Sequence, residues 1–304
     1  MELIFLGTSS AVPSKHRNHS GIAIKAFGEI MLFDCGEGTQ RQLSNAKISP
    51  MKINQIFISH LHGDHILGLP GLIQSMGFRG RDSQDPLYIY GPIGLKKVKG
   101  AIFDFGHFTV DFPVIIHEID NNGMDTNIIV ENEEYIVECI KTRHNVINLS
   151  YSIYGKKKPR FLREKAIELG IKPGFNFGKL HDGQSVEVSG KLVKPEQVLG
   201  PPRSGSKIVY SGDTLPCEEM INLAKNAMIL IHEATYKDED NNKAISNAHS
   251  TASQAAKIAE QSNVSKLILT HISARYNNIN DLKEEALKIF ENTEVAHDFM
   301  NLKL

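Results

Sequence analysis

The sequence predicts an α/β protein that carries one inserted, protruding arm, and three observations support this fold class. Short strand-like runs alternate with helix-like stretches along the 304 residues, as in folds where helices cover sheets. The stretch 156–202 interrupts the alternation, because it is rich in Lys, Gly and Pro and only weakly periodic over Phe161–Leu169. A dense group of histidines directly follows one apolar run. We therefore expect a single domain over 1–304 with the arm 156–202 inserted in it.

The first part of the chain is expected to open with a strand over Met1–Leu6. Two further strands pair around the Gly28-Glu29 turn, and Gly91-Pro92 is typical of a turn that enters a helix. Between these points the expected elements are strands Ile22–Ile24 and Ile30–Phe33, helix Gly38–Asn45, strand Ile56–Ser59, helix Leu67–Met76 and strand Leu87–Tyr90.

The rest of the chain continues the alternation on both sides of the arm. Thr251 and Gln254 have the spacing of a capping box, and Asn280 suits the N-cap of the last helix. The expected elements are strands Val114–Ile116, Ile128–Val130, Tyr135–Ile140 and Ser150–Tyr154, then strand Lys207–Tyr210, helix Glu218–Lys225, strand Met228–His232, helix Ser253–Gln261, strand Leu267–Thr270, helix Asp281–Phe290 and strand Val295–Phe299.

Composition excludes several classes of protein. The 34 basic and 35 acidic residues give a net charge of -1, so no global field attracts a polyanion, although a local basic surface still can. The cysteines Cys35, Cys139 and Cys217 are odd in number and form no C-x-x-C pair, which argues against a disulfide framework and a thiolate zinc site. The chain opens without a basic leader, and no apolar run approaches the ~20 residues that span a bilayer. We expect a cytoplasmic protein without a membrane partner.

The most informative segment is Ser59-His60-Leu61-His62-Gly63-Asp64-His65. Three imidazoles and a carboxylate follow an apolar strand within a few positions. These ligands suit Zn²⁺ and also accept Mn²⁺ or Fe. A loop that leaves a strand end can direct His60 and His62 at one metal centre and Asp64 and His65 at another.

This H-x-H-x-D-H string resembles the signature of the metallo-β-lactamase superfamily. The resemblance implies a four-layer αββα sandwich with the site at one rim, and it predicts three further ligands in order along the chain. Candidates stand after strand-like runs in each case. The implied set is His60, His62 and His144 for the first zinc, Asp64, His65 and His271 for the second, and Asp213 as the bridge.

Asp34 also stands at the end of a strand-like run. We expect its carboxylate to orient a ligand histidine by accepting the remaining ring N–H. The alternative is a cap of a helix or turn.

Four further strings are similar to motifs of the ribonuclease Z family, and a fifth resembles one more loosely. Pro13–Asn18 matches P-x-K-x-R-N, which includes Lys15 and Arg17, and Asp34–Gln40 matches D-C-G-E-G-T-Q. His232–Thr235 matches H-E-A-T, and His249–Thr251 matches H-S-T. The string Ser273-Ala274-Arg275-Tyr276 resembles an S-R-Y ending with one inserted residue.

The resemblance implies a zinc-dependent endoribonuclease that cleaves the 3′ trailer from precursor tRNA. A hydroxide activated by two Zn²⁺ per subunit would attack, leaving a 3′-hydroxyl on the tRNA and a 5′-phosphate on the trailer. Asp64 would also take the proton of the water. His249 would protonate the leaving ribose oxygen, and Glu233 would orient His249. The alternative for Glu233 and His249 is that they cap helices.

The resemblance also implies that the arm binds the tRNA elbow, often across a homodimer. Basic side chains there would contact phosphates without reading bases. The arm has Pro173-Gly174-Phe175 where the family commonly carries a Gly-Pro motif, and Phe175 and Phe177 would either stack on bases or pack the arm. The expected RNA contacts are Lys156, Lys157, Lys158 and Arg160 in the arm, with Lys15, Arg17 and Arg275 outside it.

Two other functions stay open at this point. A small-molecule phosphodiesterase or arylsulfatase of the same superfamily would share the ligands but would need no basic arm. A catalytically inactive RNA-binding protein would show gaps in the ligand set, and all seven candidates are present.

Overall fold

The computed structural model describes residues 1–104, 110–120, 125–188, 190–201 and 203–304. Two compact units emerge. The core unit comprises Met1–Val130, Val137–Ile153 and Lys207–Leu304, and the arm unit comprises Glu131–Ile136 and Tyr154–Ser206. The arm unit includes the segment 156–202 that the sequence analysis set apart, of which positions 189 and 202 lie outside the described residues.

Within the described residues, the first sheet of the core unit has the strand order β16-β1-β2-β3-β4-β5-β6. Strands β1 to β3 are antiparallel, and β3 to β6 are parallel. Phe27 and Gly28 join β2 to β3 with φ values of 54° and 76°, as a two-residue type I′ turn requires. The bounds are β1 Glu2–Gly7, β2 Gly21–Ala26, β3 Glu29–Phe33, β4 Ile53–Phe57, β5 Leu87–Pro92, β6 Val114–Ile119 and β16 Asn301–Lys303.

The second sheet has the order β15-β14-β13-β12-β9-β8-β7 among the described strands. Strands β12 to β15 are parallel. All five residues of β13 are buried, as expected for a central strand that is covered on both faces. The bounds are β7 Asn127–Glu131, β8 Tyr135–Thr142, β9 Asn148–Lys157, β12 Arg203–Tyr210, β13 Ile229–Glu233, β14 Leu267–Thr270 and β15 Thr293–Val295.

The two sheets of the core unit pack face to face through aromatic rings. Phe33 of β3 lies 5.9 Å from Tyr151 of β9 and 6.3 Å from Tyr210 of β12, measured between ring centroids. Phe57 of β4 lies 5.7 Å from the same Tyr151 ring. Edge-to-face and tilted contacts at these distances are favourable beyond the area they bury.

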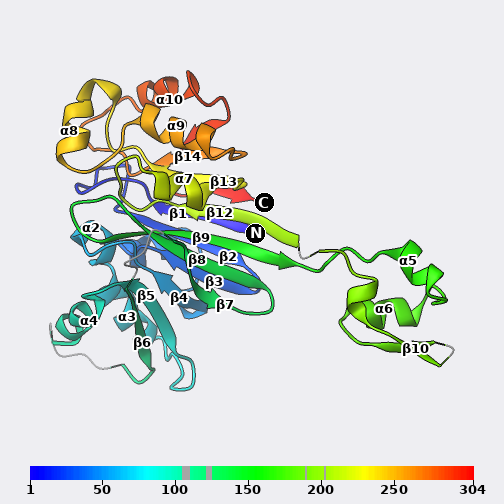
Figure 1. Cartoon of the computed structure of the whole chain (residues 1–304). Helices are drawn as coiled ribbons and strands as arrows, with labels where there is room; N and C mark the ends of the chain where they lie inside the picture. Colours follow the sequence, from blue (N-terminus) through cyan, green and yellow to red (C-terminus); the bar gives the residue numbers. More distant parts are fainter. Residues whose placement is uncertain (105–109, 121–124, 189, 202) are drawn as a thin grey trace. The chain divides into compact units, whose positions relative to one another are not determined.

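Helices cover the outer face of each sheet (Figure 1). Leu72 and Met76 of α3 pack with the first sheet, and Leu223 of α7 and Ala255 of α9 pack with the second. These layers confirm the predicted αββα sandwich. The core-unit helices are α1 Thr39–Asn45, α2 Gly63–Ile66, α3 Leu69–Phe78, α4 Leu95–Asp104, α7 Glu218–Ala224, α8 Asn241–Ser246, α9 Ala252–Gln261 and α10 Asn280–Leu287, with 3₁₀ turns at Pro50–Lys52 and Asp238–Asp240.

The arm unit has a small core of its own. Ala166, Leu180 and Val198 are fully buried there. Phe177 packs into this core with its ring centroid 4.7 Å from that of Phe161, whereas Phe175 is 79% exposed. Its elements are α5 Arg163–Glu168, α6 Phe175–His181, β10 Val186–Val188, β11 Lys191–Val193 and a 3₁₀ turn at Pro195–Gln197.

Several element predictions need correction. The chain forms the short helix α2 over Gly63–Ile66, where the sequence predicted only a loop. The expected strand Val295–Phe299 is wrong, because β15 ends at Val295 in the second sheet and β16 begins at Asn301 in the first. Asn280 is not the N-cap of α10, since the helix already includes it. The capping box of Thr251 and Gln254 is confirmed.

None of the described helices combines the length and the apolar character that a membrane span requires.

Candidate active site

The histidine cluster lies where β4 ends and the chain turns into α2. His60 and His65 are fully buried, and Asp64 and His65 stand in the single helical turn of α2. Gly63 is the first residue of that turn and Gly68 follows it, and a Cβ at Gly68 would lie only 2.1 Å from the carbonyl oxygen of Gly36. The close approach of these two backbone segments therefore requires glycine and holds the cluster against the loop after β3.

Three imidazoles form the first group of ligand atoms. The Nδ1 atom of His62 lies 3.0 Å from Nε2 of His60 and 3.4 Å from Nε2 of His144. His144 comes from the loop between β8 and β9, more than 80 positions from the other two along the chain. Three nitrogens so close together have the spacing of ligands around one cation.

A second group combines a carboxylate with two imidazoles. The Nε2 atoms of His65 and His271 are 3.3 Å apart. The Oδ2 atom of Asp64 lies 3.4 Å from the first of these nitrogens and 3.3 Å from the second. His271 directly follows β14 and has φ 58°, a left-handed conformation that is unusual for a residue other than glycine.

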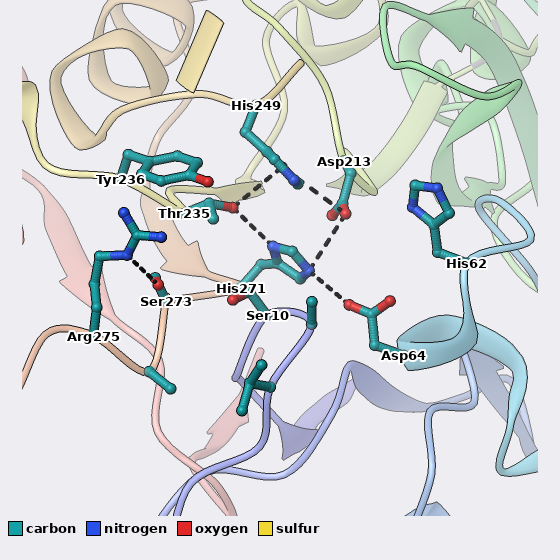
Figure 2. Close-up of a pocket in the computed structure, with 13 residues that line it drawn as sticks. Ser10, His62, Asp64, Asp213, Thr235, Tyr236, His249, His271, Ser273 and Arg275 are labelled. Atoms are coloured by element: carbon teal, nitrogen blue, oxygen red, sulfur yellow. Dashed lines mark hydrogen bonds and ion pairs between the residues drawn. The ribbon is translucent and has the colours of Figure 1, made fainter. Parts of the chain in front are cut away.

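Asp213 lies between the two groups, as Figure 2 shows for its contact with His271. Its Oδ2 atom is 3.6 Å from Nε2 of His60, 3.4 Å from Nε2 of His65 and 3.3 Å from Nε2 of His271. Its Oδ1 atom is buried and has no hydrogen-bond partner among the described residues. Burial opposes ionisation, but His271 and His65 lower the pKa of Asp213 well below its ordinary value.

These atoms fit divalent cations. Six histidine and aspartate side chains direct nitrogen or oxygen atoms at a shared space around Asp213, and a buried carboxylate oxygen without a partner is costly unless a cation pairs with it. The structure therefore brings together all seven residues predicted as ligands.

Asp34 contacts His65 of the second group on the ring nitrogen that does not face the other candidate ligands. Its Oδ2 atom lies 2.7 Å from Nδ1 of His65 and accepts hydrogen bonds from the hydroxyls of Tyr210 and Ser59. Its Oδ1 atom accepts the backbone N–H of Ser59 at 2.7 Å. The geometry that the predicted orienting role requires is present, because an N–H on Nδ1 leaves Nε2 of His65 free as a ligand atom.

Two more ligand rings are oriented in the same way. Nδ1 of His271 lies 2.8 Å from the hydroxyl of Thr235, and Nδ1 of His144 lies 2.8 Å from the carbonyl oxygen of Ala248. Ala248 has φ 57°, which turns that carbonyl toward the site. Both contacts leave the Nε2 atoms available to a cation.

A paired histidine and glutamate adjoin the candidate ligands. Nδ1 of His249 lies 2.8 Å from Oε1 of Glu233, which is completely buried. The backbone N–H groups of Thr214 and Thr235 and the hydroxyl of Thr235 also donate to this carboxylate. Burial disfavours the charged imidazole, but the carboxylate outweighs burial and raises the pKa of His249 to about 9.

The predicted cationic contact Arg275 lies in the same cavity of about 400 Å³, which also exposes His62, Asp64 and His249 (Figure 2). Its Nε atom donates to the hydroxyl of Ser273 at 3.0 Å, and its guanidinium lies 4.9 Å from the ring centroid of Tyr236. The Arg275 side chain is 42% exposed and its Nη1 atom lies 4.0 Å from Oδ2 of Asp240, so the guanidinium is partly paired and partly open to solvent.

The other predicted RNA contacts divide into two kinds. Lys15 is exposed, but Arg17 turns inward, where its Nη1 atom donates to the Thr8 hydroxyl and the Ala296 carbonyl, both at 2.7 Å. Arg17 therefore holds the loop after β1 to the C-terminal segment. In the arm unit Lys156, Lys157, Lys158 and Arg160 are exposed; Lys156 pairs with Glu131 and Lys158 with Asp182.

Thr235 and Tyr236 are site residues that the sequence motifs did not indicate by their side-chain chemistry. Thr235 links His271 to the His249–Glu233 pair, because its hydroxyl contacts both His271 and Glu233. The position of Thr235 in the H-E-A-T string could have identified it. No sequence pattern indicates Tyr236, since its position beside Arg275 depends on two segments that are distant along the chain.

Comparisons with known proteins agree with this geometry. Residues 183–272 match the family model described as beta-lactamase superfamily domain, and residues 1–161 match the model described as anti-Pycsar protein Apyc1. The crystal structure of human tRNase Z, short form, superposes with a TM-score of 0.73 at 27% identity and covers 100% of this chain and 99% of that one. The fold and the site define an enzyme of the metallo-β-lactamase superfamily.

Curated relatives narrow this assignment. Ribonuclease Z of Methanothermobacter thermautotrophicus is 53% identical over 304 residues, covering 100% of this chain and 97% of that protein. Ribonuclease Z of Methanosarcina mazei is 44% identical over 306 residues, covering 100% and 98%. The chain belongs to the ribonuclease Z family and is a nuclease.

Proposed function

We propose that this protein is an endoribonuclease that removes the 3′ trailer from precursor tRNA, leaving a 3′-hydroxyl on the tRNA and a 5′-phosphate on the trailer. The convergence of seven ligand side chains beside the His249–Glu233 pair is the observation that carries the proposal. Relatives named ribonuclease Z at 44–53% identity over the whole chain, and the likeness to human tRNase Z, support the choice of substrate.

Two zinc ions per subunit are the proposed cofactors, and Mn²⁺ or Fe would suit the same nitrogen and oxygen donors. When bound, the cations supply a water that ionises near neutral pH and stabilise the attacking and leaving oxygens of an in-line displacement. The first site would use His60, His62 and His144, the second would use Asp64, His65 and His271, and Asp213 would join the two.

The protein's own groups then manage the protons. Asp64 lies beside both His65 and His271 and would accept the proton of the attacking water. His249 would donate a proton to the leaving ribose oxygen, since its Nδ1 is held by Glu233 and its other nitrogen is free to face the cavity. General acid catalysis of this kind typically contributes ~10²–10⁴-fold.

The arm unit would supply affinity for the tRNA elbow. The exposed cations Lys156, Lys157, Lys158 and Arg160 suit phosphate contacts, and the exposed Phe175 ring with Lys179 4.7 Å from its centroid suits stacking. A homodimer in the cytoplasm, with one subunit's arm holding the tRNA that the other cleaves, is the proposed assembly. Sedimentation with and without tRNA tests the dimer.

The decisive experiment is incubation of the zinc-loaded full-length protein with 3′-extended precursor tRNA, followed by mapping of the cut and of both end groups. We expect one cut at the 3′ end of the tRNA body. The matched control is a linear RNA of the same 3′ sequence without the tRNA fold. Equal cleavage of both RNAs would contradict a dedicated tRNA enzyme.

The same experiment separates the two alternatives. A small-molecule phosphodiesterase would hydrolyse bis(p-nitrophenyl) phosphate efficiently and leave precursor tRNA intact. An inactive RNA-binding protein would bind precursor tRNA and hydrolyse neither substrate, although the ligand set is complete.

A further inference from the structure

A second surface of the core unit has the chemistry of a phosphate-binding groove. A cavity of about 610 Å³ opens between α1 and α3. Three cationic side chains line it, and no acidic residue is among the described residues that do so. The lining residues are Gln40, Arg41, Ser44, Lys47, Ile48, Ser49, Pro50, Ser75 and Arg79.

The cations are free to take an anion. Arg41, Lys47 and Arg79 are exposed, and none of the described carboxylates lies within ion-pair distance of them. In a chain whose net charge is -1, three cations gathered without a counter-ion form a local positive field that attracts a polyanion. The hydroxyls of Ser44 and Ser49 add uncharged donors on the same wall.

The backbone at Lys47 supports a functional reading of this lysine. Lys47 has φ 56°, while the backbone N–H groups of Lys47 and Ile48 bond back to the carbonyls of Ser44 and Leu43. This is the Schellman end of a helix, a position that usually carries glycine because a side chain strains the left-handed backbone. A lysine kept at such a position places its cation in the groove at a conformational cost.

Each helix that forms the groove begins shortly after a segment that contacts or carries candidate ligands. α1 begins five residues after Asp34, which contacts His65, and α3 begins directly after Gly68, which packs on Gly36. The side chain of Gln40 on α1 hydrogen-bonds Ser75 on α3, so the two walls are joined. Arg79 lies at the far end of α3, about 15 Å along that helix from its start.

We infer that Arg41, Lys47 and Arg79 form a second contact for the RNA backbone, separate from the arm unit, which binds phosphates of the double-stranded stem next to the cleaved bond. The inference rests on the proposed function for the identity of the RNA. Such contacts are electrostatic and independent of sequence. They would hold a stem whose end lies at the ligand cluster. This name denotes the seven candidate metal ligands His60, His62, Asp64, His65, His144, Asp213 and His271.

The test is a triple variant, Arg41→Gln, Lys47→Gln and Arg79→Gln, in the zinc-loaded full-length protein. The matched control replaces three exposed lysines elsewhere on the core unit: Lys225→Gln, Lys257→Gln and Lys288→Gln. We expect the KM for precursor tRNA to rise about tenfold in the groove variant, with its logarithmic salt dependence reduced by ~2–3. The kcat for the tRNA and the rate of hydrolysis of bis(p-nitrophenyl) phosphate should stay unchanged, because both depend on the ligand cluster and on correct folding.

Three outcomes would overturn the inference or distinguish it from self-association and from failure of the proposed function. A KM and salt dependence equal to those of the lysine control would overturn it. A change in sedimentation of the groove variant without RNA would assign the surface to contact with a second copy of the chain instead. If the unmodified protein fails to cleave precursor tRNA, the proposed function fails, and binding titrations of the same RNA against salt still test the groove.

Discussion

The ligand cluster and the arm unit differ in how far their charged side chains are exposed to solvent. In the cluster, the ionisable side chains are buried or partly buried and each contacts another, as Asp213 contacts His60, His65 and His271. In the arm unit, cations such as Lys157 and Arg160 stand in solvent, over a small apolar core. A buried site can fix atoms to within a fraction of an ångström, whereas exposed cations bind phosphates without a fixed geometry. The comparison predicts that one substitution in the cluster greatly lowers the catalytic rate, whereas each substitution of an exposed cation lowers RNA affinity by a small amount.

The largest effect is expected from Asp213→Ala. It removes the carboxylate that three ligand histidines share, so zinc content should fall and cleavage of both precursor tRNA and bis(p-nitrophenyl) phosphate should drop about 10⁴-fold, since metal catalysis supplies several kcal/mol. Metal analysis and steady-state kinetics measure this, with Lys257→Gln as the control. Full zinc content together with normal turnover would show that the cluster is not the active site.

His249→Ala should slow precursor tRNA cleavage about 10³-fold, within the range for a lost general acid. Hydrolysis of bis(p-nitrophenyl) phosphate should change little, because p-nitrophenolate leaves without a proton. Single-turnover rates on the two substrates make the comparison. Equal losses on both would assign His249 to structure or metal binding instead of proton donation.

Glu233→Gln tests the same pair through pH. Because the carboxylate raises the pKa of His249 to about 9, its removal should lower this pKa, so that His249 loses its proton at a lower pH. The alkaline fall in kcat/KM should therefore move to lower pH. Bound cations lower the pKa in both proteins and preserve the direction of the difference. An unchanged alkaline limb would argue against the pairing.

The orienting contacts should have smaller effects. Thr235→Val removes the hydroxyl that joins His271 to Glu233, and Asp34→Ala removes the acceptor for His65. Each should weaken zinc affinity or activity by ~10–100-fold, measured by competition with a chelator. Thr235→Ser keeps the hydroxyl and should keep the affinity. Unaltered zinc affinity in Asp34→Ala would remove its orienting role.

The smallest effect is expected in the arm unit. Replacing Lys156, Lys157, Lys158 and Arg160 with Gln should raise the KM for precursor tRNA about tenfold and flatten its salt dependence, because each phosphate contact adds a similar electrostatic increment. Turnover of bis(p-nitrophenyl) phosphate should be retained. Equal loss of both activities would show that the arm supports the cluster and has no separate role in RNA binding.

Local patterns in the sequence were sufficient for much of the site. His60 to His65 lie within one short string after a buried strand, and His144, Asp213 and His271 each follow a strand-like run whose end the sequence locates. The short helix α2 escaped prediction, since a single turn of four residues is too short to show a helical period.

The sequence by itself determined the layered α/β architecture and indicated the candidate ligands in their order, because apolar periodicity and ligand chemistry are local properties of the chain. Only the tertiary structure decided which groups face each other. It turned Arg17 inward to Ala296, placed Thr235 between His271 and Glu233, and packed Phe177 into the arm's core while it left Phe175 exposed. Such contacts join residues that are far apart in sequence or alike in composition, and only packing distinguishes them.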